Sequence, residues 1–295
     1  MTLDVLADAD EAAARAAKAA GVAVRELESL AELEAMTALF DEIWEPDAAN
    51  PSLRVDLLRA LTKAGNYASG AYDVASGELL GACIGFFGPP SHAELHSHIA
   101  GVKAAGLGRA VGFALKVHQR AWCLRRDTRV IAWTYDPLIR RNAYFNLVKL
   151  GARPVEYLRN FYGVMDDAIN AGTETDRMLV HWDLRSDVAA EACAGKLRPA
   201  SLADERARGA VVALSAGEDG RPAARLPVAG GSGARRFLVG VPADIEAMRL
   251  SDPARAAAWR GALRDVLSPL VAGGARVTGF DRSGWYVVSK EGDER

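Results

Sequence analysis

Residues 94–124, ELHSHIAGVKAAGLGRAVGFALKVHQRAWCL, decide how this chain is expected to fold. Polar and apolar residues first alternate, as they do in a half-buried strand. A glycine-rich bend follows, and an amphipathic helix begins directly after the bend. Backbone N–H groups at a helix N-terminus bind phosphates well, so we expect a phosphate-bearing ligand at this bend.

Two common phosphate-binding motifs do not fit the bend. A P-loop ends in Gly-Lys followed by Ser or Thr, and the bend has neither the lysine nor the hydroxyl. A dinucleotide fingerprint needs the spacing G-x-G-x-x-G after the first strand of its unit. Here Gly106, Gly108 and Gly112 are spaced G-x-G-x-x-x-G, and several expected strands precede them. A tight turn that binds no ligand is the structural alternative.

The composition is that of an ordinary globular protein, with 295 residues of which 50% are hydrophobic and 25% charged. The formal net charge of −2 gives no reason to expect nucleic acid. No apolar run is long enough for a spanning helix, and the N-terminus lacks a signal-peptide pattern. Three widely spaced cysteines suit a reducing compartment. We therefore expect a cytoplasmic protein that binds neither nucleic acid nor a membrane.

The expected elements over residues 22–185 follow the order β-α-α-β-β-β-α-β-α-β-β. Residues 1–21 are expected to form an N-terminal helical arm, and residues 186–208 a linker or surface helix. Residues 209–295 are expected to form a smaller C-terminal α/β unit. Among the later elements, the patterns predict helices over 138–151 and 244–274 and strands over 157–163 and 176–184.

This element order, together with the bend, resembles the GNAT superfamily of acyl-CoA-dependent N-acyltransferases. The resemblance covers residues 22–185 well and the C-terminal tail more loosely. It implies an α/β (α+β) fold with a mixed, mostly antiparallel central sheet, flanking helices and an acyl-CoA co-substrate. The segments that carry it are HSHIAGV (96–102), GFALKVHQRAW (112–122), WTYDPLIRRNAYFNLVKLGA (133–152), NFYGVMDDAINAG (160–172) and DRMLVHW (176–182).

The coenzyme loop of this family reads [Q/R]-x-x-G-x-[G/A], and two registers are open in this sequence. Residues 103–108 match the letters better, whereas residues 107–112 place the loop directly before the helix, and we prefer the second. In it a leucine and an alanine replace the usual Arg/Gln and glycine. The resemblance therefore implies coenzyme contacts from Val102, Leu107, Gly108, Arg109, Ala110, Val111 and Gly112, and, one turn apart on the next helix, from Asn142 and Asn146. Arg109 could add a charge contact to the pyrophosphate.

The strand before the bend supplies the candidate catalytic residues. Alternate strand residues share a face, so Glu94, His96 and His98 are expected on one face and Leu95, Ser97 and Ile99 on the other. Histidine titrates near neutral pH, so both histidines are candidate bases for an acceptor amine. The resemblance places His96 where relatives often carry a glutamate base. Glu94 would orient a histidine or bind the amine. A solvated strand face is the alternative, and a metal site lacks further ligands at a telling spacing.

The family's usual general acid is missing from this sequence, because Leu147 stands where many relatives of this family carry a tyrosine. Tyr135, Tyr144 and Tyr162 are the other candidates, and a thiolate also leaves unprotonated. Asp136, Arg140 and Arg141 could grip an acceptor, although a solvated surface is the simpler interpretation.

The resulting hypothesis is a GNAT-type N-acyltransferase. It would move an acetyl, succinyl or similar group from acetyl-CoA, succinyl-CoA or another acyl-CoA directly to the amine of a small molecule such as an amino acid, without a metal. A non-catalytic acyl-CoA-binding sensor or assembly partner, and a protein-lysine acetyltransferase, are the alternatives. The C-terminal unit would act as a lid over the acceptor cleft or as a homodimer surface.

Overall fold

The computed structural model describes residues 3–45, 53–165, 173–225 and 233–290, so part of the expected segment 160–172 lies outside the described residues. Contacts divide the chain into two compact units. Unit 1 comprises residues 1–133 and 182–194, and unit 2 comprises residues 134–181 and 195–295. This division differs from the expected boundaries, because residues 134–181 group with the C-terminal residues.

Unit 1 contains a sheet and the helices that cover it. Its elements are α1 (Leu3–Ala20), β1 (Val22–Glu26), α2 (Leu30–Trp44), α3 (Val55–Lys63), β2 (Tyr67–Asp73), β3 (Leu79–Phe87), β4 (Glu94–Val102), α4 (Val111–Leu124), most of β5 (Val130–Tyr135) and α6 (Asp187–Cys193). The 3-10 turns η1 (Pro90–His92) and η2 (Ala104–Gly106) flank β4. Among the described residues, no helix is both long enough and apolar enough to cross a membrane.

The sheet of unit 1 is mixed and mostly antiparallel, which confirms the expected α/β fold class. Strands β1, β2, β3 and β4 pair in this order, each antiparallel to the next, and β5 lies parallel to β4. The pairing of β4 with β5 covers only residues 94–96 and 130–132. Beyond it, β4 continues to Val102 paired with β3 alone. The edge of residues 97–102 that faces away from β3 therefore has no strand partner among the described residues.

A β-bulge in β4 changes which side chains share a face. Ile84 of β3 pairs with Ile99, whereas the next residue, Gly85, pairs with Ser97, so His98 is the extra residue. Ile99 packs against the core cluster that contains α2. The expectation that Ile99 lies on the face opposite His96 is therefore wrong: His96 pairs with Phe86, which lies two residues from Ile84 and shares its face. The inserted residue inverts the alternation of the strand.

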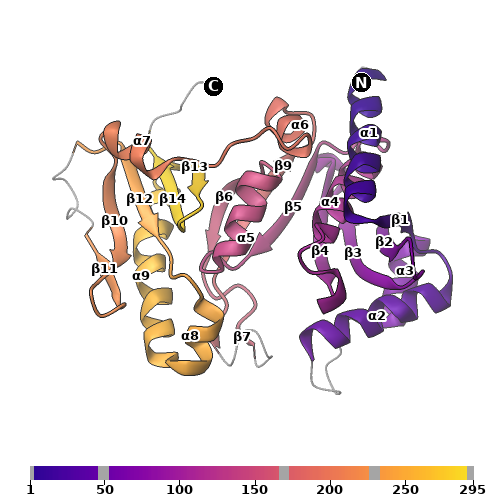
Figure 1. Cartoon of the computed structure of the whole chain (residues 1–295), viewed down its shortest axis with the longest axis horizontal. Helices are drawn as coiled ribbons and strands as arrows, with labels where there is room; N and C mark the ends of the chain where they lie inside the picture. The colour runs from indigo at the N-terminus through magenta and orange to yellow at the C-terminus, as the bar shows by residue number, and fades with distance from the viewer. Residues whose placement is uncertain (1–2, 46–52, 166–172, 226–232, 291–295) are drawn as a thin grey trace. The chain divides into compact units, whose positions relative to one another are not determined.

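Helices cover both faces of this sheet. α2 begins with a reciprocal capping box, in which the Ser29 side chain and the Glu32 side chain each accept a bond from the other's backbone N–H. α2 and α3 pack on one face, and their core includes Leu33, Met36, Phe40 and Leu58. α1 packs along α4, as Figure 1 shows at the indigo end of the chain.

The three cysteines of the chain, Cys83, Cys123 and Cys193, all belong to unit 1 and are buried and unpaired. Burial raises the pKa of each of these thiols. They therefore behave as small apolar core residues, with little of the thiolate that a nucleophile needs.

Unit 2 is a second α/β unit. Its sheet has the order β11-β10-β12-β14-β13, in which only β10 and β12 are parallel, and β6 pairs with β9 beside a short β7–β8 ladder. Figure 1 shows α9 alongside the sheet. The elements are α5 (Arg140–Tyr144), η3 (Phe145–Lys149), β6 (Arg153–Leu158), β7 (Val164–Met165), β8 (Thr173–Glu174), most of β9 (Arg177–Asp183), α7 (Leu202–Ala207), β10 (Val211–Ala216), β11 (Pro222–Ala224), β12 (Arg236–Gly240), α8 (Ile245–Ser251), α9 (Pro253–Ala272), β13 (Arg276–Asp281) and β14 (Trp285–Ser289).

Buried polar contacts tie residues 134–181 to the C-terminal part of unit 2. Asp136, 5% exposed, accepts hydrogen bonds from Arg249 and, at 2.7 and 2.6 Å, from Arg260. Burial alone would raise the pKa of this carboxyl, but the two guanidinium groups lower it to about 2. Tyr286 donates to the carbonyl of Pro137 at 2.8 Å. These partners are more than a hundred residues apart in sequence.

Three elements of unit 2 differ from their expected form. The expected helix 138–151 is an α-helix only over Arg140–Tyr144 and continues as a π-helix over Phe145–Lys149. The strand expected over 157–163 lies earlier, at Arg153–Leu158. The expected helix 244–274 is two helices, because Pro253 cannot continue α8 and Asp252 caps α9 through the backbone N–H of Arg255.

Candidate functional site

The bend after β4 leaves the N-terminus of α4 open. β4 ends at Val102, η2 covers Ala104–Gly106, and α4 begins at Val111. Ala110 is the N-cap residue, in the left-handed conformation, and no side chain caps the helix. The first turn of an α-helix carries backbone N–H groups without intrahelical partners, so these donors remain open to a ligand. The start of the helix at Val111 suits the register over residues 107–112.

Each glycine of the bend has a different role. Gly106 is required sterically, since a Cβ there would lie 2.7 Å from the side chain of Val102. Gly108 has a φ of +77°, which disfavours any side chain, but its surroundings are empty. A Cβ on Gly112 would meet only Val102, at an ordinary 3.6 Å. The protein itself therefore does not need glycine at position 112, which suits a residue that leaves room for a ligand.

The side chain of Arg109 contacts other parts of the protein, which indicates a role other than a pyrophosphate contact. The guanidinium of Arg109 forms an ion pair of 2.6 Å with Asp73 and donates to the carbonyls of Ala20 and Gly21. Backbone hydrogen bonds and this ion pair lower the pKa of Asp73 to about 2. Arg109 thus anchors the bend to the β1–β2 end of the sheet. Leu107 is 67% exposed.

The two candidate histidines lie together on β4. Their ring centroids are 6.1 Å apart, and both rings contact Phe86 of β3, at 5.1 Å from His96 and 5.7 Å from His98. His96 is half-buried, and His98, the bulge residue, is exposed. Bulges re-aim side chains and are over-represented next to active sites. Glu94, also half-buried, lies on the same strand, in register with Val130.

The pKa values of both histidines are below the ordinary value. Desolvation, then the neighbouring charges of His98 and Lys116, lower the pKa of His96 to about 4. Desolvation lowers the pKa of His98 as well. Both imidazoles are therefore neutral at neutral pH and able to accept a hydrogen bond, and the lowered pKa makes His96 a weak acceptor of a proton.

Lys116 is a buried cation beside this strand that the sequence patterns did not single out. Its amine donates to Ser97 Oγ and Gln119 Oε1, both at 2.9 Å, and lies 3.9 Å from the ring centre of Trp133. The residue is 4% exposed, and desolvation lowers the pKa of its amine to about 8. The only signal in the sequence is a lysine within the apolar run Ala114–Val117 of α4.

The candidate residues on the later helix belong to unit 2. Asn142 lies in α5 and is half-buried, whereas Asn146 lies in the π-helical turn and is 4% exposed. Because one turn of a π-helix contains an extra residue, the two asparagines are not spaced as in a regular α-helix. π-turns are frequent at functional sites. The structure therefore leaves a coenzyme contact at these residues as an expectation.

The candidate general acids are also distributed within unit 2. Tyr135 is buried and bonded to the hydroxyl of Tyr286 at 3.1 Å, and burial raises its pKa. It is therefore part of the core of that unit. Tyr162 is 43% exposed, and its hydroxyl oxygen is hydrogen-bonded to Thr134 Oγ1 at 3.2 Å. Leu147 is 8% exposed, and Asp136 is buried among arginines, so Asp136 is not available to grip an acceptor.

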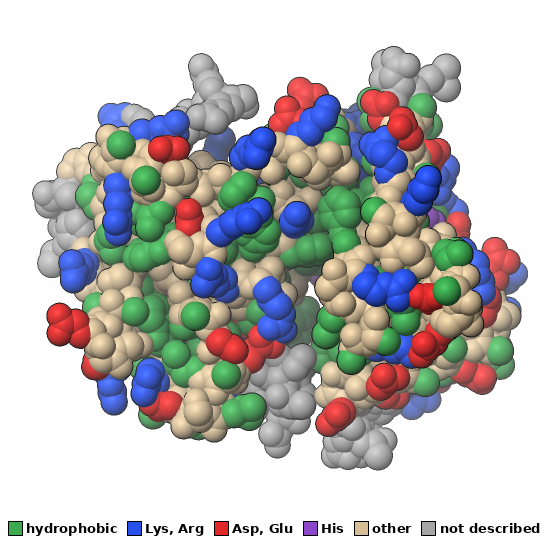
Figure 2. All heavy atoms as spheres, in the orientation of Figure 1, with side chains coloured by type: hydrophobic (Ala, Val, Ile, Leu, Met, Phe, Trp, Pro, Cys, Tyr) green, Lys and Arg blue, Asp and Glu red, His purple; other side chains and the backbone are tan. Residues whose placement is uncertain are grey.

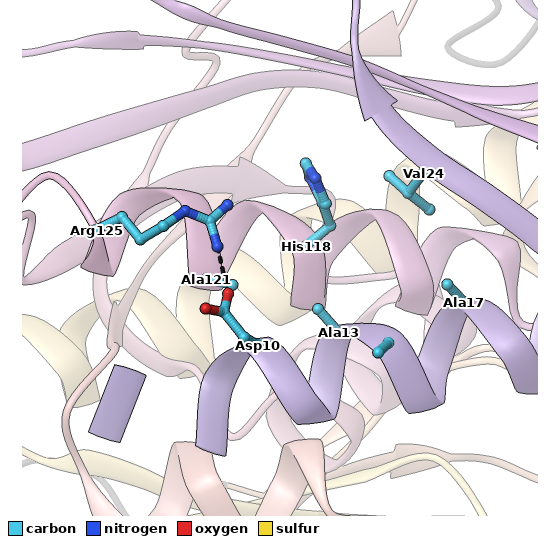
Figure 3. Close-up of a pocket in the computed structure, with 8 residues that line it drawn as sticks. Asp10, Ala13, Ala17, Val24, His118, Ala121 and Arg125 are labelled. Carbon is cyan, nitrogen blue, oxygen red and sulfur yellow. Dashed lines mark hydrogen bonds and ion pairs between the residues drawn. The ribbon is translucent and has the colours of Figure 1, made fainter. Parts of the chain in front are cut away.

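A pocket of about 270 Å³ in unit 1 lies between α1 and α4, away from the bend. Figure 3 shows its two charged residues, Asp10 and Arg125, paired with each other. His118, which also lines the pocket, is bonded to the hydroxyl of Tyr67 at 2.8 Å. The first pair joins α1 to the C-terminal end of α4, and the second joins α4 to β2, so these polar groups already have partners within the unit. The described residues contain no cluster of His, Cys, Asp and Glu that could hold a metal ion.

No family model matches the chain, and no curated protein matches it. Solved structures do resemble part of it. An N-acetyltransferase from Staphylococcus aureus Mu50 has 14% sequence identity and a TM-score of 0.46, covering 56% of this chain and 99% of that chain. The ribosomal-protein-S18-alanine N-acetyltransferase from Escherichia coli has 14% sequence identity and a TM-score of 0.45, and the match covers 56% of this chain and 95% of that chain. Aminoglycoside 6′-acetyltransferase type Ii has 16% sequence identity and a TM-score of 0.45, and the match covers 56% of this chain and 98% of that chain.

Proposed function

We propose that this protein is a GNAT-fold N-acyltransferase that uses an acyl-CoA. The observation that carries the proposal is the early end of the β4–β5 pairing, beside the open N-terminus of α4. An unpaired strand edge offers backbone N–H and C=O groups to an extended chain that carries amides, as the pantetheine arm does. The helix N-terminus that follows offers N–H groups and a positive dipole end to a pyrophosphate.

The residues on β4 would act on the acceptor amine. An α-amino group has a pKa near 8, so about a tenth of it is neutral at neutral pH, and a nearby base raises the reactive fraction. His98, exposed at the bulge, is the imidazole that an acceptor can reach, and we assign it as the base. The less accessible His96 would accept a hydrogen bond and hold the geometry. Glu94 remains the candidate for orienting a histidine or binding the amine.

The amine nitrogen would attack the thioester carbonyl directly, the base would take the proton of the amine, and coenzyme A would leave as the thiolate. An acyl-cysteine intermediate is not part of this proposal, since the three thiols are buried with raised pKa values. The acyl group we propose is acetyl, succinyl or similar, and the acceptor a small amine such as an amino acid.

A donor and acceptor screen tests this function. Purified protein is mixed with acetyl-CoA or succinyl-CoA and a panel of amino acids and amines, and thiol release is confirmed by the mass of the acylated product. Release that depends on both substrates is expected. Coenzyme A binding without turnover would instead favour an acyl-CoA sensor, the alternative that the absence of a tyrosine at Leu147 supports. Absence of both would overturn the proposal.

The histidine assignment has its own test. The double variant His96→Ala/His98→Ala is expected to lower turnover well over tenfold, because a general base typically contributes about 10²–10⁴-fold, while coenzyme A still binds. His92→Ala is the matched control, because His92 is exposed in the same unit and lies just before β4. Unchanged turnover in the double variant would sink the assignment.

A further inference from the structure

Unit 2 contains a pocket whose charged lining residues are all basic. Its volume is about 490 Å³, and its lining residues are Arg140, Arg141, Tyr144, Lys149, Ala243 and Arg282. Figure 2 shows basic side chains gathered over the part of the face where Figure 1 places α5. The pocket lies wholly within unit 2, and none of its residues belongs to the β4 strand or the bend.

Two of the basic residues, Arg140 and Arg282, are held in place by hydrogen bonds. Arg140 donates to the backbone carbonyl of Arg282, and its side chain lies against Gly284, where a Cβ would be 3.1 Å from Arg140 Cδ. Arg282 in turn donates from Nε to the hydroxyl of Tyr144 at 3.1 Å. The turn between β13 and β14 is thereby fastened to α5. The guanidinium groups of Arg140 and Arg282 therefore have defined positions at the pocket.

Part of the positive charge in this pocket is not neutralised by an ion pair. Arg141 has a carboxylate partner, Glu246. Within the described residues, Arg140, Lys149 and Arg282 form no ion pair.

The nearby carboxylates Asp281 and Asp244 accept hydrogen bonds from backbone N–H groups. Asp281 accepts from the backbone N–H groups of Ser283 at 2.7 Å and Leu202 at 3.1 Å. Asp244 caps α8 through the N–H groups of Glu246 and Ala247. Burial alone would raise the pKa of Asp281, but its hydrogen bonds from Ser283 and Leu202 and the charge of Arg140 lower it, so Asp281 also acts on Arg140. Lys149 and Arg282 are therefore the two cations of the pocket that carry the uncompensated positive charge, and the Tyr144 hydroxyl, which accepts from Arg282, keeps its own proton to donate.

We propose that this pocket binds the phosphate monoester group of a small molecule. A phosphate dianion offers several acceptor oxygens, and guanidinium groups bind them with strong, charge-assisted hydrogen bonds. The volume leaves room for an organic group attached to the phosphate. Two sources carry this chemistry: the 3′-phosphate of coenzyme A, and a separate phosphorylated metabolite. The site rests on unit 2 alone and does not depend on the proposed transferase activity.

Calorimetric titration of the full-length protein at low ionic strength tests the site. The probes are inorganic phosphate and phenyl phosphate, with chloride at equal ionic strength as the reference. The variant Lys149→Ala/Arg282→Ala keeps the Arg282 carbonyl that Arg140 binds. Because it removes two charge-assisted contacts, phosphate binding is expected to weaken by about tenfold or more. The control is Arg276→Ala, which removes an exposed positive charge of the same unit outside the pocket and is expected to change binding by less than about twofold.

The outcomes separate the two sources. Competition of phenyl phosphate by coenzyme A, but not by 3′-dephospho-coenzyme A, would support the site and assign it to the acyl donor. Phosphate binding with no competition by coenzyme A would support the site and assign it to a separate phosphorylated molecule, whether or not the chain proves to be a transferase. Absence of phosphate binding in the wild type, or equal weakening in the double variant and in Arg276→Ala, would overturn the proposal.

Discussion

Lys116 illustrates how one buried side chain affects stability. Its amine is removed from water in unit 1 and held by two neutral hydrogen-bond acceptors, Ser97 and Gln119. A buried cation without a carboxylate partner is costly, and the chain reduces this cost by favouring the neutral amine. The lowered pKa of Lys116, about 8, is the measurable sign of that cost.

Lys116→Met should remove a pH-dependent penalty. The folded pKa of about 8 lies below the ordinary 10.5, so between these values the unfolded chain binds the proton more tightly and stability rises with pH. The free energy of unfolding of the wild type, minus that of Lys116→Met, should therefore increase by about 3 kcal/mol across this window. Urea denaturation at both ends of the window measures it.

The control for this prediction is Lys63→Met, which changes an exposed lysine at the end of α3 in the same unit. Its difference from the wild type should stay nearly flat over the same pH range. If Lys116→Met and the wild type depend on pH in parallel, the amine of Lys116 does not titrate abnormally in the folded protein.

At the scale of single residues, the sequence predicts types of side chain better than their directions. The alternation rule predicted His96 and His98 on one face of the strand, and the structure places their ring centroids 6.1 Å apart. The same rule failed for Ile99, because a bulge adds one residue without changing the composition of the strand. Arg109 could not be assigned from its position in the motif, since its partner Asp73 lies on another strand.

At the scale of an element, the bend between β4 and α4 allows structure and binding to be separated. Gly112→Ala should leave the unbound protein as stable or raise its stability by up to about 1 kcal/mol, because alanine is the better helix former. Its Cβ would meet only Val102 in the protein. The affinity for coenzyme A should nevertheless fall about tenfold, since the methyl group enters the space beside the helix N-terminus. Thermal unfolding and calorimetry measure the two effects.

Gly108→Ala is the companion variant. It should cost about 1 kcal/mol of stability, because Gly108 has a φ of +77° and alanine adopts this conformation poorly.

Full coenzyme A affinity in Gly112→Ala would show that the bend does not hold the pyrophosphate.

The order of the elements could be predicted because periodicity and turn residues mark most of them. The structure confirms the expected β-α-α-β-β-β-α-β-α-β-β order and adds the short β7–β8 ladder within it. The π-turn at Phe145–Lys149 could not be predicted, since its sequence also suits an α-helix. The strand at Arg153–Leu158 begins with an Arg-Pro pair, which obscured its start.

At the scale of the whole molecule, Asp136 should be essential to unit 2. Asp136→Asn would leave the buried guanidinium of Arg260 without its carboxylate, at a cost of about 3–5 kcal/mol. Hydrogen exchange should then accelerate in unit 2, over residues 134–165, 173–181, 195–225 and 233–290, while unit 1 keeps its protection. Asp219→Asn is the control, because Asp219 forms an exposed surface pair in the same unit. Equal loss in both units would contradict two separable units.

The boundary between the units is the part of the architecture that the sequence could not supply. Composition changes near residue 186, and the expected boundary followed that change. The contacts that decide membership are long-range: Asp136 with Arg260, and Pro137 with Tyr286. No local sequence pattern predicts a contact between residues so far apart along the chain.

Because its three cysteines are buried, the folded protein should not react with chromogenic thiol reagents. Because all three belong to unit 1 and none to unit 2, reagent uptake by the free protein would count openings of unit 1 alone. In an assay of the proposed transferase activity, a fast burst of colour would then come from released coenzyme A and not from the thiols of the protein, whereas denaturant should expose three thiols per chain. The chain thus carries its own stoichiometric reporter of partial unfolding, without any introduced label.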